Sequence, residues 1–324
     1  LAAAATSSMA GAEPSEWPAY GGAPGGGHYT AASQINANNV AELGLAWSHR
    51  SGDFVAGSQG FGEEMTAESL QNRPTNFIVT PIMVADTLYY CTPFNRVFAL
   101  DPASGKEKWV FDPEVDMAHE SITNCRAVSS WQDSARDTGS CHHRIFLGTL
   151  DARLIALDAA SGEPCTDFGN NGEVSLNAGL TEHEASEYGI TSAPAIIGDL
   201  VVTGAFVIDS RRPDVPSGVV RAYDARTGEF AWGWNPVHPE YAQMDEAGKY
   251  TPGSSNVWST ISVDPERGLV IVPTGNSSPD YYGGDRDGHK DYYSSSVVAL
   301  NAADGSVAWH YQTVHHDIWD FDIP

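Results

Sequence analysis

Short runs of β-branched and aromatic residues, each bounded by glycine, aspartate or proline, recur along the chain. The clearest runs cover residues 87–91, 144–147, 200–202 and 269–272. Apolar runs of this length between turn-forming residues predict β-strands joined by hairpins. No window approaches eighteen consecutive apolar residues, so the pattern predicts no membrane-spanning helix. The chain is therefore expected to be an all-β protein.

A turn motif recurs between these runs. It consists of Ala, an Asp or Asn two residues later, Gly four residues after that, and Trp four residues after the Gly. The copies begin at Ala99, Ala156, Ala222 and Ala299, so their spacing is 57, 66 and 77 residues. This spacing is too long for helix pairs and fits multi-strand units with inserted loops. The second copy has no tryptophan, and Cys165, three residues after Gly162, is interpreted as taking its position.

Each residue of the motif has a role in a propeller blade. Asp caps the hairpin turn and Gly supplies a positive φ, while Trp packs its large apolar face against the neighbouring sheet. The repeat predicts a β-propeller; the alternative is that similar turns arose by chance in an unrelated β-sandwich. Trp47 is interpreted as the end of an incomplete first unit. Four blades and part of a fifth do not close a ring at this period, so we expect a fragment of a larger propeller.

The composition limits the classes of binding partner and separates a short N-terminal segment from the rest of the chain. The net charge is −25, from 42 acidic and 17 basic residues. Nucleic acid and anionic membranes both need a positive surface, so the charge disfavours them as partners; a basic protein or a high-salt habitat fits the charge. Residues 1–16 are rich in Ala, Ser and Gly and are interpreted as a signal remnant or linker. Residues 17–324 are expected to form the propeller.

The four cysteines, Cys91, Cys125, Cys141 and Cys165, form no Cys-x-x-Cys pair. This pattern disfavours a zinc site and leaves two alternatives, disulfides in an exported protein or buried thiols. If a disulfide forms, the expected pair is Cys125 with Cys141.

Acidic and aromatic residues are concentrated near the end of the chain, in residues 311–322. This segment contains Asp317, Asp320 and Asp322 together with two histidines and Trp319. Carboxylates this close repel each other unless a cation lies between them or they take part in proton transfer. The alternative interpretation is an acidic turn exposed to solvent.

Several short stretches, taken together with the blade motif, carry a resemblance to a known family. They are Asn124–Arg126, Ile190–Pro194, Asn256–Trp258, Thr274–Asn276 and His315–Asp320. The chain resembles the pyrroloquinoline-quinone (PQQ) dehydrogenases, and within them the glucose, polyol and quinate type. The resemblance runs from about Trp17 to Pro324 and covers about the first half of such an enzyme. It implies an eight-bladed propeller of four-stranded sheets, of which this chain forms four to five blades, with PQQ and a divalent cation near its axis.

The resemblance also implies roles for individual acidic and amide residues. The cation ligands would be Asp209, Asn276 and Asp320, and hard oxygen ligands of this kind suit Ca²⁺, with Mg²⁺ or a lanthanide as alternatives. Asp320 would also be the catalytic base that removes the substrate hydroxyl proton. Asp322 lies where lanthanide-using relatives place an extra ligand, but sugar-oxidising relatives have an acid there too, so it does not decide the metal.

Three further residues would hold the cofactor. Trp258 would stack on its flat face, the alternative being another inter-blade tryptophan. Arg126 would pair with a cofactor carboxylate, which a planar guanidinium does well, and Thr191 would be a hydrogen-bonding lid residue beside it. The vicinal His315 and His316 are instead interpreted as residues that pack a turn.

The implied function is that of an exported PQQ-dependent dehydrogenase. It would transfer a hydride from a sugar, polyol or cyclic alcohol to PQQ, and pass electrons to membrane quinone or cytochrome c. The expected location is the periplasm, with attachment to the inner membrane left open. Phe206, where alcohol-oxidising relatives often have Ser, and the absence of adjacent cysteines favour sugars, polyols or cyclic alcohols.

Two alternatives remain open at this stage. One is a non-enzymatic periplasmic propeller scaffold, such as an outer-membrane assembly protein. The other is a degenerate family member that binds a ligand without turnover. Ile78, which stands where many relatives carry an acid, favours this second alternative.

Overall fold

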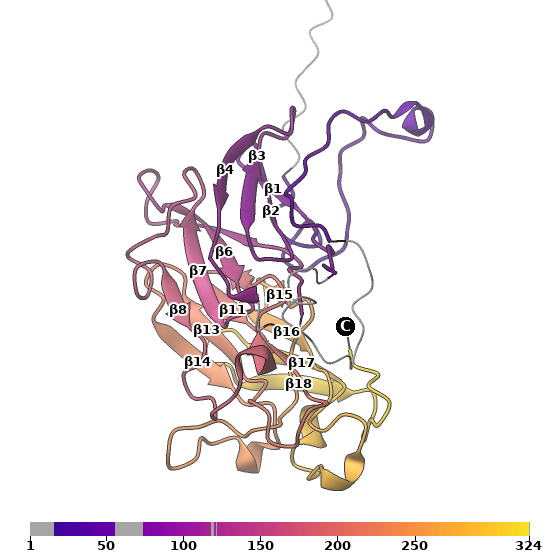
Figure 1. Cartoon of the computed structure of the whole chain (residues 1–324), viewed down its shortest axis with the longest axis vertical. Coiled ribbons are helices and arrows are strands. Elements are labelled where there is room, and N and C mark those ends of the chain that lie inside the picture. Colours follow the sequence, from indigo (N-terminus) through magenta and orange to yellow (C-terminus); the bar gives the residue numbers. More distant parts are fainter. Residues whose placement is uncertain (1–15, 56–73, 118–119, 121, 324) are drawn as a thin grey trace, which may run out of the picture.

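The computed structural model describes residues 16–55, 74–117, 120 and 122–323. In these residues the strands form four four-stranded antiparallel sheets and one two-stranded sheet (Figure 1). The predicted signal remnant falls almost entirely outside the described residues. No helix in the described part of the chain has the length and apolarity needed to cross a membrane.

The four large sheets follow one another along the chain, and in each the strands are paired in sequence order. The first sheet contains β1 (Ile82–Val84), β2 (Thr87–Cys91), β3 (Val97–Leu100) and β4 (Glu107–Phe111). The second contains β5 (Ser129–Gln132), β6 (His143–Gly148), β7 (Arg153–Asp158) and β8 (Glu173–Ser175). The third contains β10 (Ala195–Ile197), β11 (Leu200–Thr203), β13 (Val220–Asp224) and β14 (Phe230–Trp234). The fourth contains β15 (Ser262–Asp264), β16 (Leu269–Pro273), β17 (Ser296–Asn301) and β18 (Val307–Gln312).

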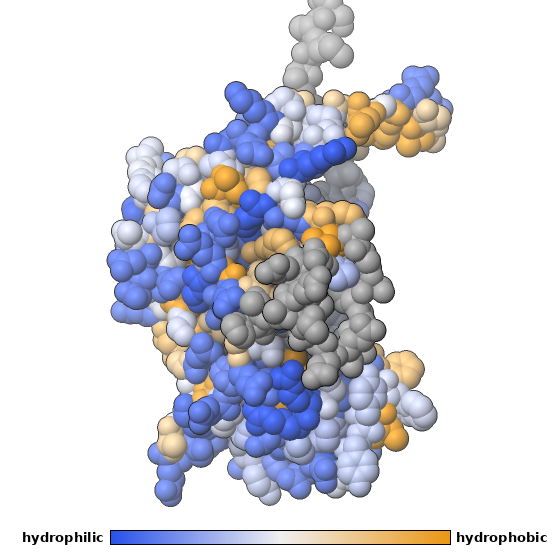
Figure 2. Space-filling view, in the orientation of Figure 1, coloured by the Kyte–Doolittle hydropathy of each residue, from blue (hydrophilic) through white to orange (hydrophobic). Residues whose placement is uncertain are grey.

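The remaining elements are short. The two-stranded sheet pairs β9 (Tyr188–Gly189) with β12 (Phe206–Val207). The helical segments of the described chain are 3₁₀ turns: η1 (Val40–Glu42), η3 (Ala185–Glu187), η4 (Pro239–Tyr241), η5 (Gly283–Asp285) and η6 (Asp291–Tyr293). Ahead of the first sheet an arm projects away from the body (Figure 1). Figure 2 shows orange, apolar surface on this arm. The exposed large apolar residues of this segment include Ile35, Val40, Leu43 and Leu45.

The arrangement of the sheets is that of consecutive propeller blades. The innermost strand β10 contacts both β5 and β15, the innermost strands of the sheets on either side. Three apolar clusters fill the spaces between consecutive sheets, one for each interface. The predicted β-propeller is therefore confirmed, and the described residues form four complete blades.

The turn motif has the geometry that its residues predict. In the first blade, Oδ1 of Asp101 accepts a hydrogen bond of 2.8 Å from the Ser104 amide, and Gly105 has a φ of 69°. In the third blade, Asp224 caps Thr227 at 2.8 Å in the same way. A left-handed φ of this kind favours glycine over any residue with a Cβ. The motif therefore closes the hairpin between the third and fourth strands of a blade.

Three tryptophans join neighbouring blades through this hairpin. Each lays its indole against the motif glycine of the next blade, so that a Cβ on the glycine would collide with the ring. Each also donates from Nε1 to a backbone carbonyl in the same turn: Trp47 to Pro102 at 3.0 Å, Trp109 to Ala159 at 3.0 Å, and Trp232 to Ala302 at 2.8 Å. The predicted docking role is thus confirmed for all three.

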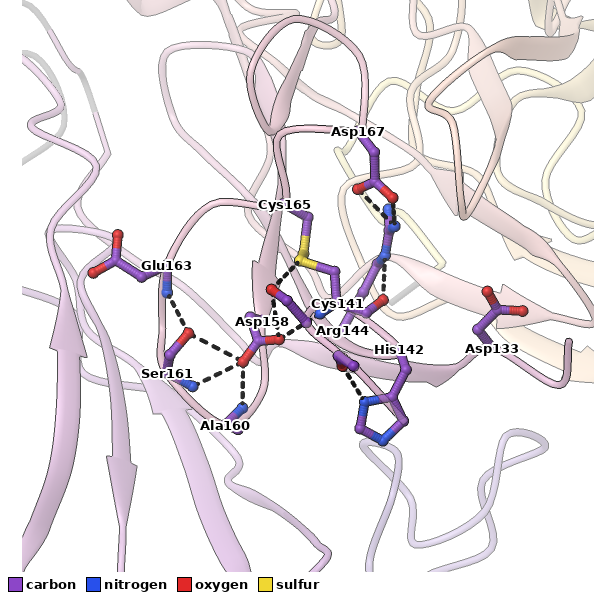
Figure 3. The surroundings of a disulfide bond; sticks show 12 residues. Asp133, Cys141, His142, Arg144, Asp158, Ala160, Ser161, Glu163, Cys165 and Asp167 are labelled. Carbon is purple, nitrogen blue, oxygen red and sulfur yellow. Dashed lines mark hydrogen bonds and ion pairs between the residues drawn. A yellow bond between two sulfur atoms is a disulfide. The ribbon is translucent and has the colours of Figure 1, made fainter. Parts of the chain in front are cut away.

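The interface between the second and third blades lacks this tryptophan. The Cys165 amide donates to the carbonyl of Ala156 at 2.8 Å, which places Cys165 opposite the motif alanine, where the other blades have tryptophan. Its side chain forms a disulfide with Cys141 (Figure 3). The second disulfide joins Cys91 to Cys125.

The predicted pairing of Cys125 with Cys141 is therefore wrong. Cys125 lies in the chain between the first two blades, in the same apolar cluster as Cys91. Cys141 lies in the loop between β5 and β6, in the cluster that contains Cys165. The two cysteines that are closest in sequence point into different inter-blade spaces, so proximity along the chain was a poor guide.

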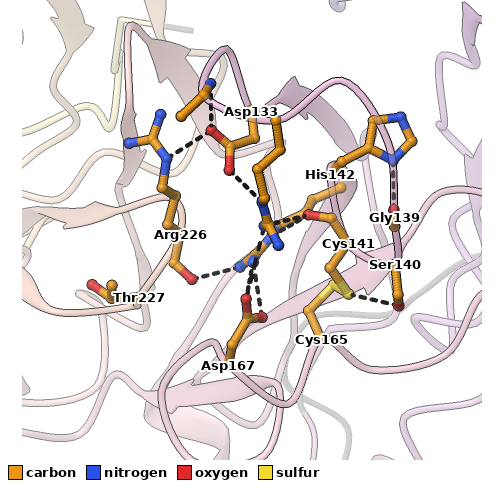
Figure 4. Close-up of polar contacts among 12 residues, drawn as sticks. Asp133, Gly139, Ser140, Cys141, His142, Cys165, Asp167, Arg226 and Thr227 are labelled. Carbon is orange, nitrogen blue, oxygen red and sulfur yellow. Dashed lines mark hydrogen bonds and ion pairs between the residues drawn. A yellow bond between two sulfur atoms is a disulfide. The ribbon is translucent and has the colours of Figure 1, made fainter.

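Arg144 on β6 replaces the missing indole. Its fully buried guanidinium donates to the carbonyls of Ala225 at 3.1 Å and Arg226 at 2.7 Å in the motif turn of the third blade. Ala225 is the equivalent of the alanines that accept from Trp109 and Trp232. Both oxygens of Asp167 accept from Nη2 of Arg144 at 2.8 Å (Figure 3). Figure 4 shows Asp167 and Arg226 together with the Cys141–Cys165 disulfide. A charged group anchored beside a disulfide thus makes the contact that an indole makes elsewhere.

Candidate active site

The segment after β18 is organised by Asp317, which is almost fully buried. Its two carboxylate oxygens accept from the backbone amides of Trp319 and Phe321, each at 2.9 Å. Within this turn Asp320 and Asp322 adopt left-handed backbone conformations, with φ of 55° and 43°. Such conformations cost about 1–3 kcal/mol each and persist where surrounding contacts impose them. Asp317 is therefore a structural residue that presents the next two aspartates.

Asp322 is held by two donors from other loops. Its Oδ2 accepts from Nε1 of Trp258 at 2.7 Å, and its Oδ1 accepts from the Asn276 amide at 2.8 Å. Burial raises the pKa of Asp322 above its usual value, although the bond from Trp258 opposes this shift. Asp322 thus ties the terminal segment to the loops that carry Trp258 and Asn276.

Asp320 is held differently. The hydroxyl of Tyr281 donates to Oδ2 of Asp320 at 2.9 Å. This hydrogen bond raises the pKa of Tyr281 to about 12. Asp320 is only partly buried, and this hydroxyl engages one of its two carboxylate oxygens.

Asp209 follows β12 and belongs to the same acidic group. Its Oδ2 accepts from Nδ2 of Asn256 at 2.9 Å, and its backbone carbonyl accepts from the Ser278 hydroxyl. Burial raises its pKa well above the usual value, and the negative charges of Asp280, Asp322 and Asp320 raise it further.

Asp280 joins this group although the sequence analysis did not single it out. It is 2% exposed, and burial together with the charge of Asp320 raises its pKa to about 6. None of the four aspartates, Asp209, Asp280, Asp320 and Asp322, forms an ion pair with a basic residue of the described chain. In the sequence, Asp280 is distinguished only by its place four residues after Asn276, where an acid is typical of an ordinary loop.

Three buried amide atoms near these loops have no hydrogen-bond partner in the described structure: Asn124 Oδ1, Asn256 Oδ1 and Asn276 Nδ2. Orphaned buried polar atoms carry a free-energy cost and mark places where an ion or ligand can bind. Oδ1 of Asn276 accepts from the Ser295 hydroxyl at 3.1 Å. Rotating the Asn276 side-chain amide by half a turn would exchange the positions of Oδ1 and Nδ2. Oδ1, the atom that can bind a metal, would then lie where Nδ2 now has no partner.

Arg126, Thr191 and Trp258 lie together, as the sequence analysis expected of cofactor-binding residues. The guanidinium of Arg126 lies 4.8 Å from the Trp258 ring centroid. The carbonyl of Trp258 accepts from the hydroxyls of Thr191 at 2.9 Å and Ser192 at 2.5 Å. The Thr191 hydroxyl therefore fixes the Trp258 backbone in this structure.

Arg126 is a cation without an acidic partner. Burial lowers its pKa, and it forms no ion pair with the carboxylates of the described residues. Its one hydrogen-bond acceptor among them is the carbonyl of Trp258, at 3.5 Å from Nη1. A half-buried, unpaired guanidinium is suited to bind a carboxylate or another planar anion.

In the described residues, the four aspartates of the group do not supply three carboxylates close enough together to form a metal site by themselves. Within the described chain, one group of three His, Cys, Asp or Glu side chains has its ligand atoms within 4.8 Å of each other. It consists of Cys141, Cys165 and Asp167, and its cysteines are joined in a disulfide. Asp209 and Asp320 share an electrostatic environment but are held by separate donors.

The two histidines lie apart from this group. His315 bonds through Nδ1 to Gln312 at 2.9 Å, and His316 bonds through Nδ1 to Asp291 at 2.6 Å. Both contacts are those of turn-packing residues, as predicted. Phe206 pairs with Gly189 in the two-stranded sheet, and Ile78 is 39% exposed.

Comparison with known proteins decides the family. Residues 17–324 match the PQQ family model described as the β-propeller domain of glucose, ethanol and alcohol dehydrogenases. The chain belongs to the PQQ-dependent dehydrogenase family. The resemblance found in the motifs is therefore confirmed.

Curated relatives of this quinoprotein chain differ in their named substrates. It is 37% identical over 327 residues to a quinate/shikimate dehydrogenase (quinone) of Acinetobacter baylyi, covering 95% of this chain and 38% of that protein. It is 40% identical over 319 residues to the quinoprotein glucose dehydrogenase of Escherichia coli, again covering 95% and 38%. For the glycerol dehydrogenase large subunit of Gluconobacter oxydans the identity is 38%, and the match covers 95% of this chain and 40% of that protein.

Solved structures agree on the fold. The quinohemoprotein alcohol dehydrogenase of Comamonas testosteroni superposes with a TM-score of 0.74 at 26% identity, covering 96% of this chain and 43% of that one. A europium-containing methanol dehydrogenase superposes with a TM-score of 0.70 at 23% identity, which shows the shared fold. This quinoprotein chain spans about two fifths of the length of the curated relatives named above.

Proposed function

We propose that this chain belongs to a PQQ-dependent dehydrogenase that oxidises a hydroxyl group of a sugar, polyol or cyclic alcohol. The observation that carries the proposal is the environment of Trp258. Its ring lies beside the unpaired Arg126, and its Nε1 bonds to Asp322 of the acidic group. An anion-binding group and a cation-binding group are thus joined through one aromatic ring, which suits a flat, anionic cofactor bound with a cation.

The residues present fit this cofactor. Arg126 would hold a carboxylate of PQQ, since a planar guanidinium binds carboxylates through two hydrogen bonds. Trp258 would provide the aromatic surface for its rings. Thr191 would remain beside it as a hydrogen-bonding lid residue. When bound with a metal ion, PQQ supplies the hydride acceptor for alcohol oxidation.

A cation also fits the acidic group. We assign Asp209, Asn276 and Asp320 as its ligands, and their oxygens suit Ca²⁺, with Mg²⁺ or a lanthanide as alternatives. The raised pKa values of Asp209, Asp280 and Asp322 support this assignment. A bound cation would offset the like-charge repulsion that contributes to these shifts.

Asp320 is the proposed catalytic base. It is only partly buried, one of its oxygens accepts no hydrogen bond from the described residues, and its carboxylate would accept the proton of the substrate hydroxyl as the hydride leaves. The buried Asp317 and the doubly bonded Asp322 are less suited to this role, because their oxygens are engaged by donors of the chain.

The remaining parts of the proposal concern the whole protein. Electrons would pass to membrane quinone or cytochrome c on the periplasmic side of the inner membrane, and a C-terminal half would complete an eight-bladed ring. A non-enzymatic scaffold accounts less well for a half-buried, unpaired arginine joined through Trp258 to a group of buried and partly buried acids.

Turnover of the full-length protein tests the proposed function. The protein would be reconstituted with PQQ and Ca²⁺ and assayed by dye reduction against aldoses, linear polyols and cyclic alcohols. We expect turnover on at least one member of this panel, abolished in Asp320→Asn. Cofactor binding without turnover on any substrate would instead support a degenerate, ligand-binding family member.

A further inference from the structure

We propose that Tyr281 is a positioning residue for Asp320, an inference that rests on the proposed function. Tyr281 lies in the loop between β16 and β17, and its hydroxyl donates to Oδ2 of Asp320 at 2.9 Å. It is the only hydrogen-bond donor that the described residues offer to the Asp320 side chain. The other acids of the group each accept at least one bond from an amide or an indole.

This single donor determines which oxygen of Asp320 remains available. The Asp317 carboxylate fixes the backbone on both sides of Asp320, but the side chain can still rotate. A carboxylate offers two oxygens as acceptors. With Oδ2 bound to Tyr281, both lone pairs of Oδ1 are left for the proposed cation and the substrate proton. Small errors in the placement of a catalytic group have large effects on rate, so the hydroxyl is expected to matter for turnover.

The loop that carries Tyr281 is itself anchored to the site. The Ser278 amide donates to the carbonyl of Gly253 at 3.0 Å, and its hydroxyl donates to the carbonyl of Asp209. The Tyr281 amide donates to Oδ1 of Asp280 at 3.0 Å. These contacts hold the backbone of the loop without the phenol. The position of the Tyr281 hydroxyl is thus set by the same chain segments that hold Asp209.

The Tyr281 ring contributes little packing, because the residue is 62% exposed. Tyr281→Phe therefore removes the donor while leaving the fold intact. The neighbouring Tyr282 is 64% exposed, and in the described residues no hydrogen bond joins its hydroxyl to any of the four aspartates, so Tyr282→Phe is a matched control. Both variants are compared with the wild-type full-length protein.

The experiment combines binding with steady-state kinetics. Calorimetry measures the Kd of Ca²⁺ and of PQQ on the cofactor-free proteins, and the reconstituted proteins are assayed with a substrate carrying hydrogen or deuterium at the reacting carbon. For Tyr281→Phe we expect kcat to fall about 10-fold, with KM and both Kd values within about threefold of wild type. The primary isotope effect should rise, since the chemical step becomes slower. Tyr282→Phe should match wild type in every measurement.

Each other outcome overturns the inference in a distinguishable way. If wild type turns over and Tyr281→Phe has an unchanged kcat, the positioning role fails and the proposed function stands. If Tyr281→Phe loses more than about 10-fold in affinity for Ca²⁺ or PQQ, its role is structural support of the binding site. If wild type itself shows no turnover on the panel, the proposed function fails and the inference fails with it.

Discussion

Trp258 and Asp322 are joined by a hydrogen bond of 2.7 Å between the indole Nε1 and a carboxylate oxygen. The two residues are 64 positions apart, Trp258 in the segment before β15 and Asp322 in the segment after β18. Because Arg126 lies against the same indole, this contact connects the cationic and acidic parts of the proposed site. Trp258 is thus distinct from the blade-docking tryptophans, whose Nε1 groups bond to backbone carbonyls.

Replacing this donor should weaken cofactor binding. In Trp258→Phe the aromatic face remains, but Asp322 loses a donor to a charged group, worth about 1.5–3 kcal/mol. We expect calcium-dependent PQQ binding to weaken at least 10-fold, measured by quenching of protein fluorescence. Trp232→Phe is the matched control, since it loses a 2.8 Å bond to the Ala302 carbonyl away from the site. Equal PQQ affinities in the two variants would argue against a special role for Trp258.

The acidic group predicts an unusual pH dependence in the metal-free protein. Folding raises the pKa of Asp280 from 3.8 to about 6, so the folded state binds this proton more tightly than the unfolded state. The resulting stabilisation is complete below the unfolded pKa and is lost as pH rises through about 6. Allowing for solvent screening, we expect the cation-free protein to lose about 1–2 kcal/mol between pH 5 and 7.5.

Chemical denaturation of the full-length protein at several pH values measures this loss. Added Ca²⁺ should reduce it, because a bound cation favours the ionised carboxylates. Asp280→Asn removes the titrating group and should flatten the profile. A metal-free protein that is equally stable at pH 5 and 7.5, or an Asp280→Asn profile identical to wild type, would contradict the prediction.

Arg126 should contribute to PQQ binding through its geometry as well as its charge. Arg126→Lys keeps the charge but loses the planar fork, so we expect a 10-fold or greater loss of PQQ affinity with little change in Ca²⁺ affinity. Arg267→Lys, an exposed arginine paired with Asp264, serves as the control. Calorimetric titration with each ligand separates the two effects, and an unchanged PQQ Kd in Arg126→Lys would exclude Arg126 as the carboxylate anchor.

Much of the fold was predictable because the blade motif is local. The order Asp, Gly, Trp specifies a capped hairpin and a docked ring within about ten residues, so the propeller and the roles of Trp47 and Trp109 follow from the sequence alone. The disulfides were not predictable in the same way, since Cys91 and Cys125 meet only after two blades pack together. Arg144 was missed because an arginine in a strand is usually exposed, and its burial depends on the third blade.

The site was predictable only in part. The motifs that carry the resemblance point to Asp209, Asn276 and Asp320. The residue pattern of the terminal segment does not by itself separate the roles of its three acids, Asp317, Asp320 and Asp322. The structure shows that Asp317 supports the turn, Asp322 bonds to Trp258, and Asp320 faces Tyr281. The environments of Asp320 and Asp322 depend on donors from other loops, which a linear sequence does not reveal.

The interface between the second and third blades should depend on Arg144. Removing a buried charged group that satisfies several partners typically costs about 3–5 kcal/mol, so Arg144→Met should lower the free energy of unfolding by that order. The Cys141→Ser/Cys165→Ser variant opens a 24-residue loop and should lose roughly 3 kcal/mol. Denaturant unfolding of the full-length variants measures both values. Arg267→Met is the exposed control, and a loss for Arg144→Met no larger than in this control would contradict the proposed interface role.

The most direct test of the account is the cation dependence of PQQ binding to the full-length, cofactor-free protein. Titration with PQQ in Ca²⁺ and in chelator should show binding that is at least 10-fold tighter with the cation. This difference should disappear in Asp209→Asn, while the affinity measured in chelator stays close to that of wild type. Binding that is identical with and without Ca²⁺, Mg²⁺ or a lanthanide, or no binding under any of these conditions, would contradict a metal-assisted PQQ site in this propeller.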